Sequence, residues 1–210
     1  MIGKKIGIDL GTANSVVFVQ GEGIVVTEPT VVAIDLDNVT VIAVGKKAKE
    51  MIGKTPDNIV AKRPLREGVI ADSRIAEALL RHFFDKALGK ARFFKPDVVM
   101  SVPAGITSVE ERAVLKAANN VGSKTITLLP EPLLAALGAG LPIHTSSGNM
   151  IVNMGGGTTE VAVLSLDGIV EYESLRISGD ALNEYIISYM RKKKGILIGE
   201  QTAENIKIKI

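Results

Sequence analysis

Residues 6–19 read IGIDLGTANSVVFV, and residues 150–163 read MIVNMGGGTTEVAV. Each stretch is a β-rich run, a turn of small polar residues and glycine, and a second β-rich run. Each continues through a further glycine turn into another β-rich run, at residues 21–26 and 167–170. The same three-stranded meander is therefore predicted twice, which indicates an internal repeat.

Helical patterns follow both predicted meanders. In the second half, residues 178–180 offer a helix cap, apolar residues recur at helical spacing up to Met190, and Gly195 ends the run. In the first half, a stretch at about residues 33–74 predicts a small inserted subdomain. The remaining elements alternate, and we expect a helix at 75–84, a strand at 98–102, a helix at 109–121, a strand at 126–129 and a helix that begins at Glu131-Pro132.

Together these elements predict an α/β fold with two similar lobes, in which mixed sheets are flanked by helices. We place the first lobe at residues 1–142, including the inserted subdomain, and the start of the second lobe at residues 143–210. Matching glycine turns in two similar lobes favour a cleft between the lobes, with the turns facing each other across it.

The composition excludes several classes of protein. Hydrophobic residues make up 46% and charged residues 23%, which is typical of a globular chain. The net charge of +2 is too small to argue for a nucleic-acid partner, and the absence of cysteine excludes disulfides and thiolate metal sites. No apolar run approaches the ~18 residues of a membrane-spanning helix.

The paired turns predict a phosphate site, because glycine turns expose backbone N–H groups that form a concave site for anions. One such turn is also common in ordinary hairpins, but two at equivalent places of a repeat favour a shared site. Asp9 precedes the first turn, where its carboxylate either stabilises the turn or holds a hydrated Mg²⁺. The repeat places Asn153 at the equivalent position, and its uncharged amide does not accept a proton.

Residues 6–12 resemble the first phosphate motif of the actin, hexokinase and heat-shock chaperone ATPases, and residues 155–158 resemble the second. Longer stretches resemble the MreB family of bacterial actin homologues and make the resemblance specific, namely residues 9–14, 51–56, 63–72 and 155–163. The resemblance extends over essentially the whole chain. It implies an actin-like (ribonuclease H-like) fold of duplicated lobes that holds ATP and Mg²⁺ between them.

The resemblance also implies which residues bind the nucleotide. The first phosphate turn supplies Asp9, Gly11, Thr12, Ala13 and Asn14, with Asp9 holding the metal through water. The second turn supplies Asn153, Gly155, Gly156, Gly157 and Thr158. Residues 203–207 resemble the helix start whose Glu204, Asn205 and Lys207 reach the adenosine, although the charges alone would indicate a solvated helix face.

Glu131-Pro132 resembles the glutamate–proline step of the family's hydrolysis site. Pro132 suits the first helical turn, and the small apolar helix at 133–138 is expected to be buried. Glu131 would then point into the cleft and act as the catalytic residue that orients the attacking water. The alternative is a carboxylate that only interacts with the helix dipole.

Two features depart from the family pattern. The family usually has aspartate where this chain has Asn153, and the loss of an acid–base group typically lowers a rate by ~10²–10⁴-fold. We therefore expect ATP binding with slow or negligible hydrolysis. Family members also continue beyond Ile210, so we expect an incomplete second lobe.

A further resemblance concerns the membrane. Phe93 and Phe94 lie between Arg92 and Lys95 and resemble the family's membrane-insertion loop, because aromatics flanked by cations suit an anionic interface. The alternative is that these rings cap the core. The family implies self-association into filaments, a cytoplasmic location at the inner face of the cell membrane, and contact with the machinery of cell-wall synthesis.

Three other functions compete with a cytoskeletal role. A small-molecule kinase of the same superfamily needs a catalytic carboxylate aimed at a substrate hydroxyl, and we find no such motif between the turns. A chaperone ATPase needs larger insertions and a following peptide-binding domain. A degenerate nucleotide-binding module without turnover is compatible with Asn153, and it is also compatible with filament assembly.

Overall fold

The computed structural model describes residues 4–38, 40–66, 69–70, 73–89 and 95–210. A five-stranded sheet of order β10-β9-β1-β2-β3 forms the centre of the first lobe. Its strands are β1 (Lys5–Leu10), β2 (Asn14–Val19), β3 (Gly23–Pro29), β9 (Asp97–Val102) and β10 (Thr125–Pro130). Strands β1, β2 and β3 pair antiparallel, whereas β9 is parallel to β1 and to β10. The predicted first meander and mixed sheet are therefore confirmed.

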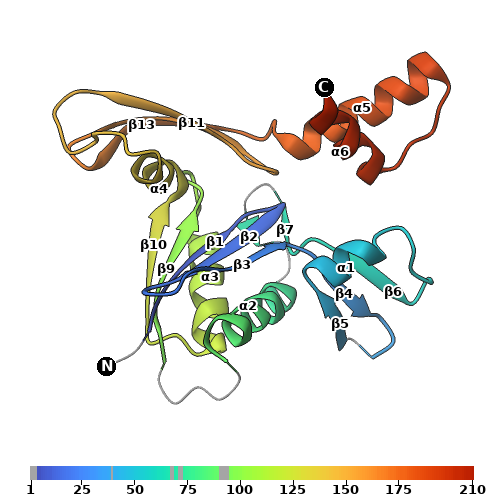
Figure 1. Ribbon diagram of the computed structural model, residues 1–210, viewed down its shortest axis with the longest axis horizontal. Helices are drawn as coiled ribbons and strands as arrows, with labels where there is room; N and C mark the ends of the chain where they lie inside the picture. The colour runs from blue at the N-terminus through green and yellow to red at the C-terminus, as the bar shows by residue number, and fades with distance from the viewer. Residues whose placement is uncertain (1–3, 39, 67–68, 71–72, 90–94) are drawn as a thin grey trace.

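Two helices, α2 (Ser73–Leu88) and α3 (Ser108–Val121), cover one face of this sheet (Figure 1). Alternate strand residues such as Ile6, Ile8 and Leu10 point to these helices and join one core cluster with Phe83 and Phe84 of α2. Because side chains alternate along a strand, Asp9 points to the opposite face, away from α2 and α3. The core thus fixes the direction of the Asp9 carboxylate.

A smaller sheet of order β5-β4-β6 lies beside the first one, with helix α1 (Lys46–Met51) packed on it (Figure 1). Its strands are β4 (Val32–Asp35), β5 (Thr40–Val44) and β6 (Ile59–Lys62). Strands β7 (Leu65–Arg66) and β8 (Val69–Ile70) then form a two-stranded sheet before α2 begins. These elements lie in the stretch at about residues 33–74 that the sequence predicts to be an inserted subdomain. The bounds of this subdomain stay a prediction.

The second meander forms an antiparallel sheet of β11 (Asn149–Met154), β12 (Thr159–Ser165) and β13 (Gly168–Leu175). Helix α4 (Glu131–Gly138) packs on one face of this sheet and contributes Ala136 to a second core cluster with Ala162 and Leu164. The opposite face exposes Met150 and Val152 of β11. The repeat predicted from the sequence is therefore present as two separate meanders.

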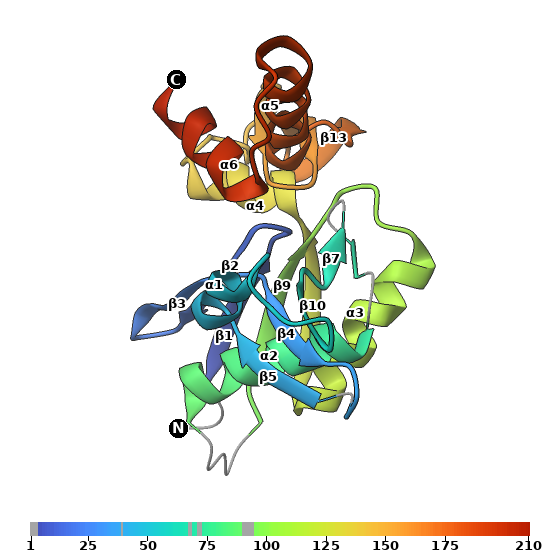
Figure 2. The same cartoon turned by 90° about the vertical axis from the view of Figure 1, so that its right-hand side faces the viewer.

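Helices α5 (Gly179–Lys194) and α6 (Glu200–Lys209) follow the second sheet and pack on each other. Figures 1 and 2 show the second sheet, α5 and α6 together above the first lobe. The sequence predicted that this helix ends at Gly195, and the structure confirms that end with Gly195 in the left-handed conformation. Within the described part of the chain, no helix is both long and apolar enough to cross a membrane.

Candidate nucleotide site

The two phosphate turns lie against each other. The first connects β1 to β2, and the second connects β11 to β12. A Cβ atom added to Gly156 would lie 2.6 Å from the Cβ of Ala13, so only glycine fits at this point of contact. A Cβ on Gly11 would lie 2.7 Å from the carbonyl oxygen of Asn14, so the first turn needs glycine too.

A cavity of about 520 Å³ opens beside the two turns, which is within the range of small-molecule sites. Its walls come from both lobes and include all ten residues predicted to hold the phosphates and the metal, together with Glu131: Asp9, Gly11, Thr12, Ala13, Asn14, Asn153, Gly155, Gly156, Gly157 and Thr158. The structure thus brings together residues that are about 140 positions apart in the sequence, as the repeat requires.

The second turn is held in shape by the start of α5. The backbone N–H groups of Gly179 and Asp180 donate to the carbonyl oxygens of Gly155 and Gly156, at 3.1 and 2.9 Å. The hydroxyl of Ser178 also donates to the Gly156 carbonyl. Ser178 occupies the predicted N-cap position, but its side chain makes no capping bond because it contacts the turn instead.

Asp9 is oriented by a residue that the sequence did not single out. The hydroxyl of Ser101, on the neighbouring strand β9, donates to Oδ1 of Asp9 at 2.7 Å. Among the described residues, no group of three or more acidic, histidine or cysteine side chains could hold a metal. One carboxylate suits Mg²⁺ here, because this ion keeps several waters and takes further oxygen ligands from phosphates.

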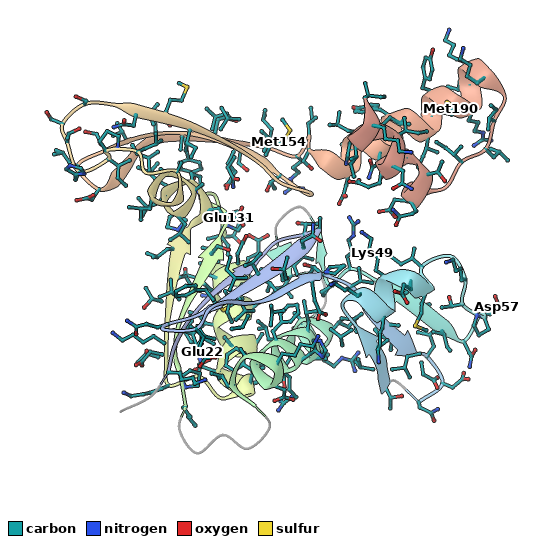
Figure 3. All side chains as sticks on the ribbon, viewed as in Figure 1. Glu22, Lys49, Asp57, Glu131, Met154 and Met190 are labelled. Atoms are coloured by element: carbon teal, nitrogen blue, oxygen red, sulfur yellow. The ribbon has the colours of Figure 1, made fainter. Side chains whose placement is uncertain are left out.

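Glu131 is the first residue of α4 and projects into the same cavity; Figure 3 shows it where the two lobes meet. Burial, assisted by the nearby carboxylates of Glu160 and Asp9, raises the pKa of Glu131 to about 7. Asn153 opposes this shift, because its Nδ2 lies 3.4 Å from Oε2 of Glu131 and donates a weak hydrogen bond. A carboxylate that titrates near neutrality suits proton transfer from water.

The prediction that helix 133–138 is buried is only partly correct. Pro132 and Ala136 are buried in α4, whereas Leu137 is 54% exposed. The helix contacts the second sheet and also β9 and β10 of the first sheet, and it leaves Leu137 and Gly138 exposed.

The predicted adenosine residues lie on α6, outside the cavity beside the turns. Glu204 accepts a hydrogen bond from Lys207 at 2.6 Å and another from Asn183 of α5 at 2.7 Å. The Lys207 contact holds the pKa of Glu204 below its usual value. Lys207 also donates to the carbonyl of Gly179 at 3.0 Å, so α6 is joined to the support of the second turn. Asn205 is exposed and contacts Gln201.

A second cavity of about 920 Å³ lies between the two turns, the small sheet and α5. It begins at Thr12 and Gly157 of the two turns, extends along α5 to Ile187, and reaches Glu200 at the start of α6. The guanidinium of Arg63, from the end of β6, lies on its wall and donates to Asp180 at 2.5 Å and to Glu200 at 2.9 Å. This arginine joins the small sheet to both helices of the second lobe.

Sequence reasoning missed Ser101, Glu160 and Arg63, although the last two lie inside motifs that were quoted. Glu160 follows the second turn and Arg63 begins the stretch 63–72. A signal was available for Glu160, since a charged residue facing the core side of a hairpin is unusual. Phe93 and Phe94, predicted to insert into a membrane, lie outside the described residues.

The fold and the cavity define an actin-like protein. MreB5 of Spiroplasma citri bound to AMPPNP has a TM-score of 0.93 and 36% identity, over 99% of this chain and 62% of that one. The MamK double helical filament has a TM-score of 0.81 at 23% identity, which shows the fold alone. The predicted actin-like fold is therefore confirmed.

A family model described as "MreB/Mbl protein" matches residues 3–210, and the chain belongs to this family of cell-shape-determining cytoskeletal proteins. It is 50% identical to the cell shape-determining protein Mbl of Bacillus cereus, over the whole chain and 63% of the relative. It is 49% identical to MreB of Escherichia coli, over the whole chain and 62% of the relative. The chain spans a little less than two thirds of these curated relatives.

Proposed function

We propose that this chain binds ATP with Mg²⁺ between its lobes and acts as the nucleotide-binding part of a filament-forming, cell-shape-determining protein. The contact of the two glycine turns beside one cavity carries this proposal, because it gathers backbone donors from both lobes. The structures of MreB5 from Spiroplasma citri with AMPPNP and with ADP support it.

Each residue of the site has a distinct role in this proposal. The turn amides hold the phosphate oxygens, and α5 keeps the second turn in shape. Asp9, fixed by Ser101, would hold Mg²⁺ through water, and the bound ion would neutralise charge on the β- and γ-phosphates. Glu131 accepts the proton of the attacking water. Glu204 and Lys207, joined to α5, would lie toward the adenosine side.

Titration of the purified chain with Mg·ATP in a calorimeter tests the binding step. We expect saturable heat with one site per chain, and a parallel titration with ADP separates the contribution of the γ-phosphate. Electron microscopy of the same sample tests for filaments. Absence of heat with any adenine nucleotide would contradict the proposal.

Hydrolysis is expected to be slow because residue 153 is an amide. Asn153 donates to Glu131 and offers no charge to the metal or to the attacking water. The variant Asn153→Asp should release phosphate faster by up to ~10²-fold, the lower end of what an acid–base group contributes. Equal and normal turnover in both proteins would show that the amide is harmless. A nucleotide-binding module without turnover is the second candidate, and the same observation favours it.

We further propose that the protein self-associates at the inner face of the cytoplasmic membrane, near the machinery of cell-wall synthesis. The sequence at Phe93 and Phe94 supports membrane contact. The double variant Phe93→Ser, Phe94→Ser should no longer co-sediment with anionic liposomes. The variant Phe18→Ser, at an exposed aromatic on β2, is the matched control and should bind as before. Unchanged sedimentation of the double variant would contradict membrane insertion by this loop.

A further inference from the structure

Glu160 is fully buried, although it carries a carboxylate and lies outside the set of predicted site residues. Its Oε1 accepts a hydrogen bond from the backbone N–H of Ala104 at 2.8 Å. Its Oε2 is also buried and has no hydrogen-bond partner among the described residues. Buried polar atoms are nearly always paired, so this oxygen calls for a functional explanation.

The strand register places Glu160 next to the hydrolysis site. Glu160 of β12 is the cross-strand partner of Asn153 of β11, and partners in antiparallel strands point to the same face. The neighbouring pair on this face, Ile151 and Ala162, packs in the cluster beneath α4. Asn153 in turn contacts the half-buried Glu131, so Asn153 has Glu131 as its hydrogen-bond partner and Glu160 as its cross-strand neighbour.

Glu160 also connects the site to the first lobe. Ala104 belongs to the loop between β9 and α3, whereas Glu160 belongs to the second sheet. The same loop contacts the second sheet again, since a Cβ atom on Gly105 would lie 3.5 Å from the Tyr172 ring. Glu160 is therefore held at the junction of the two lobes by its bond to Ala104.

We infer that Glu160 is a positioning residue for hydrolysis. It is held by a hydrogen bond from Ala104 of the first lobe, and from there its carboxylate acts on the nearby Glu131 carboxylate. This inference rests on the proposed function and deepens it. In hydrolysis, the water oxygen bonds to the γ-phosphorus, the bond to the ADP oxygen breaks, and the water proton passes to Glu131. A second anion nearby makes Glu131 a better proton acceptor. Residue 153 cannot be that anion because it is an uncharged asparagine in this chain, so the role falls to Glu160.

The groups around Glu131 are consistent with this role. Asp9 faces it from β1, Asn153 from β11 and Glu160 from β12. Of the neighbouring charges, Glu160 raises the pKa of Glu131 more than Asp9 does, after the effect of burial itself. Burial also raises the pKa of Glu160, and the Ala104 N–H opposes that shift.

The test is a pH titration of the nucleotide-free chain with glutamate carboxyl groups labelled for carbon-13 NMR. The resonances lost in Glu131→Gln and in Glu160→Gln identify the two groups. We expect Glu131 to titrate in wild type near pH 7 and to titrate at a lower pH in Glu160→Gln. Glu173→Gln, on the next strand and exposed, is the matched control and should leave the midpoint unchanged. An unmoved midpoint in folded Glu160→Gln would overturn the inference.

If Glu160→Gln does not fold, the wild-type NMR titration curves of Glu131 and Glu160 test the inference instead. Coupled groups titrate in two shared steps, whereas independent groups each titrate in a single step. Single steps would overturn the inference. With Mg·ATP, the midpoint of the pH profile of phosphate release should move to lower pH in Glu160→Gln, as the Glu131 midpoint does. KM should stay constant. Failure of the proposed function gives a different result, namely no binding heat in either protein.

Discussion

At the scale of one residue, the raised pKa of Glu131 suits proton transfer but lowers the free energy of unfolding at neutral pH. Its pKa in the folded chain is about 7, compared with an ordinary value of 4.5. The folded state therefore binds the proton more tightly than the unfolded state does. As pH rises from about 4.5 to about 7, the folded state holds more protons than the unfolded state, so the free energy of unfolding falls.

The substitution Glu131→Gln should remove this loss of stability. The pKa difference corresponds to about 3 kcal/mol at 1.36 kcal/mol per unit, so we expect a gain of about 2–3 kcal/mol above pH 7. At about pH 4 both side chains are neutral, and the gain should vanish. Urea unfolding at the two pH values measures the effect, with exposed Glu173→Gln as the control. An equal gain at both pH values would show that charge is not the cause.

At the scale of the element, the glycine turns determine what the site can hold. Gly156 and Ala13 approach so closely that a single methyl group must push the two turns apart. The N–H groups at the start of α5 are already bonded to the second turn. In the proposed complex, the phosphates would therefore be held by the turns themselves, because the Gly179 and Asp180 N–H groups are already used.

The variant Gly156→Ala should lower ATP affinity by at least about 10-fold, since the added Cβ would meet Ala13 at 2.6 Å and displace the donors. Gly148→Ala is the matched control, because its Cβ would meet Val163 at an ordinary 3.6 Å. Calorimetry with Mg·ATP compares the two variants. Equal affinity in both would mean that the contact of the turns does not shape the site.

The elements follow from local pattern, whereas several site contacts do not. Alternation along β1 places Asp9 away from the core, and the repeat predicts both meanders before any contact is known. Glu160 and Ala104 are separated by 56 positions, and Arg63 and Asp180 by 117. Such pairs are set by how the lobes pack. The side-chain bond of Ser178 was missed for the same reason, because its partner lies in the second turn.

At the scale of the whole molecule, Arg63 is the clearest connection across the second cavity. Its side chain is 24% exposed and pairs with Asp180 of α5 and Glu200 of α6. Asp180 also supports the second turn through its backbone N–H. The small sheet, both helices and the phosphate turn are thus linked through one side chain.

The variant Arg63→Ala should release a bound fluorescent ATP analogue about 3- to 10-fold faster, since partly exposed ion pairs contribute about 1 kcal/mol each at most. Arg81→Ala is the matched control, because Arg81 pairs with Glu77 within α2. Stopped-flow release rates compare the variants. Identical rates in Arg63→Ala and wild type would show that the link does not restrain the cleft.

A link made of partly exposed charges also responds to the ions around the molecule. Dissolved electrolyte screens partly exposed pairs over a Debye length of about 8 Å at physiological ionic strength. The contact between the two glycine turns involves uncharged groups, so salt does not screen it. The rate of nucleotide exchange should therefore rise with potassium chloride concentration in the native chain. In Arg63→Ala the rate should stay nearly constant. The composition of the surrounding solution would then be one of the factors that determine how long a nucleotide stays bound.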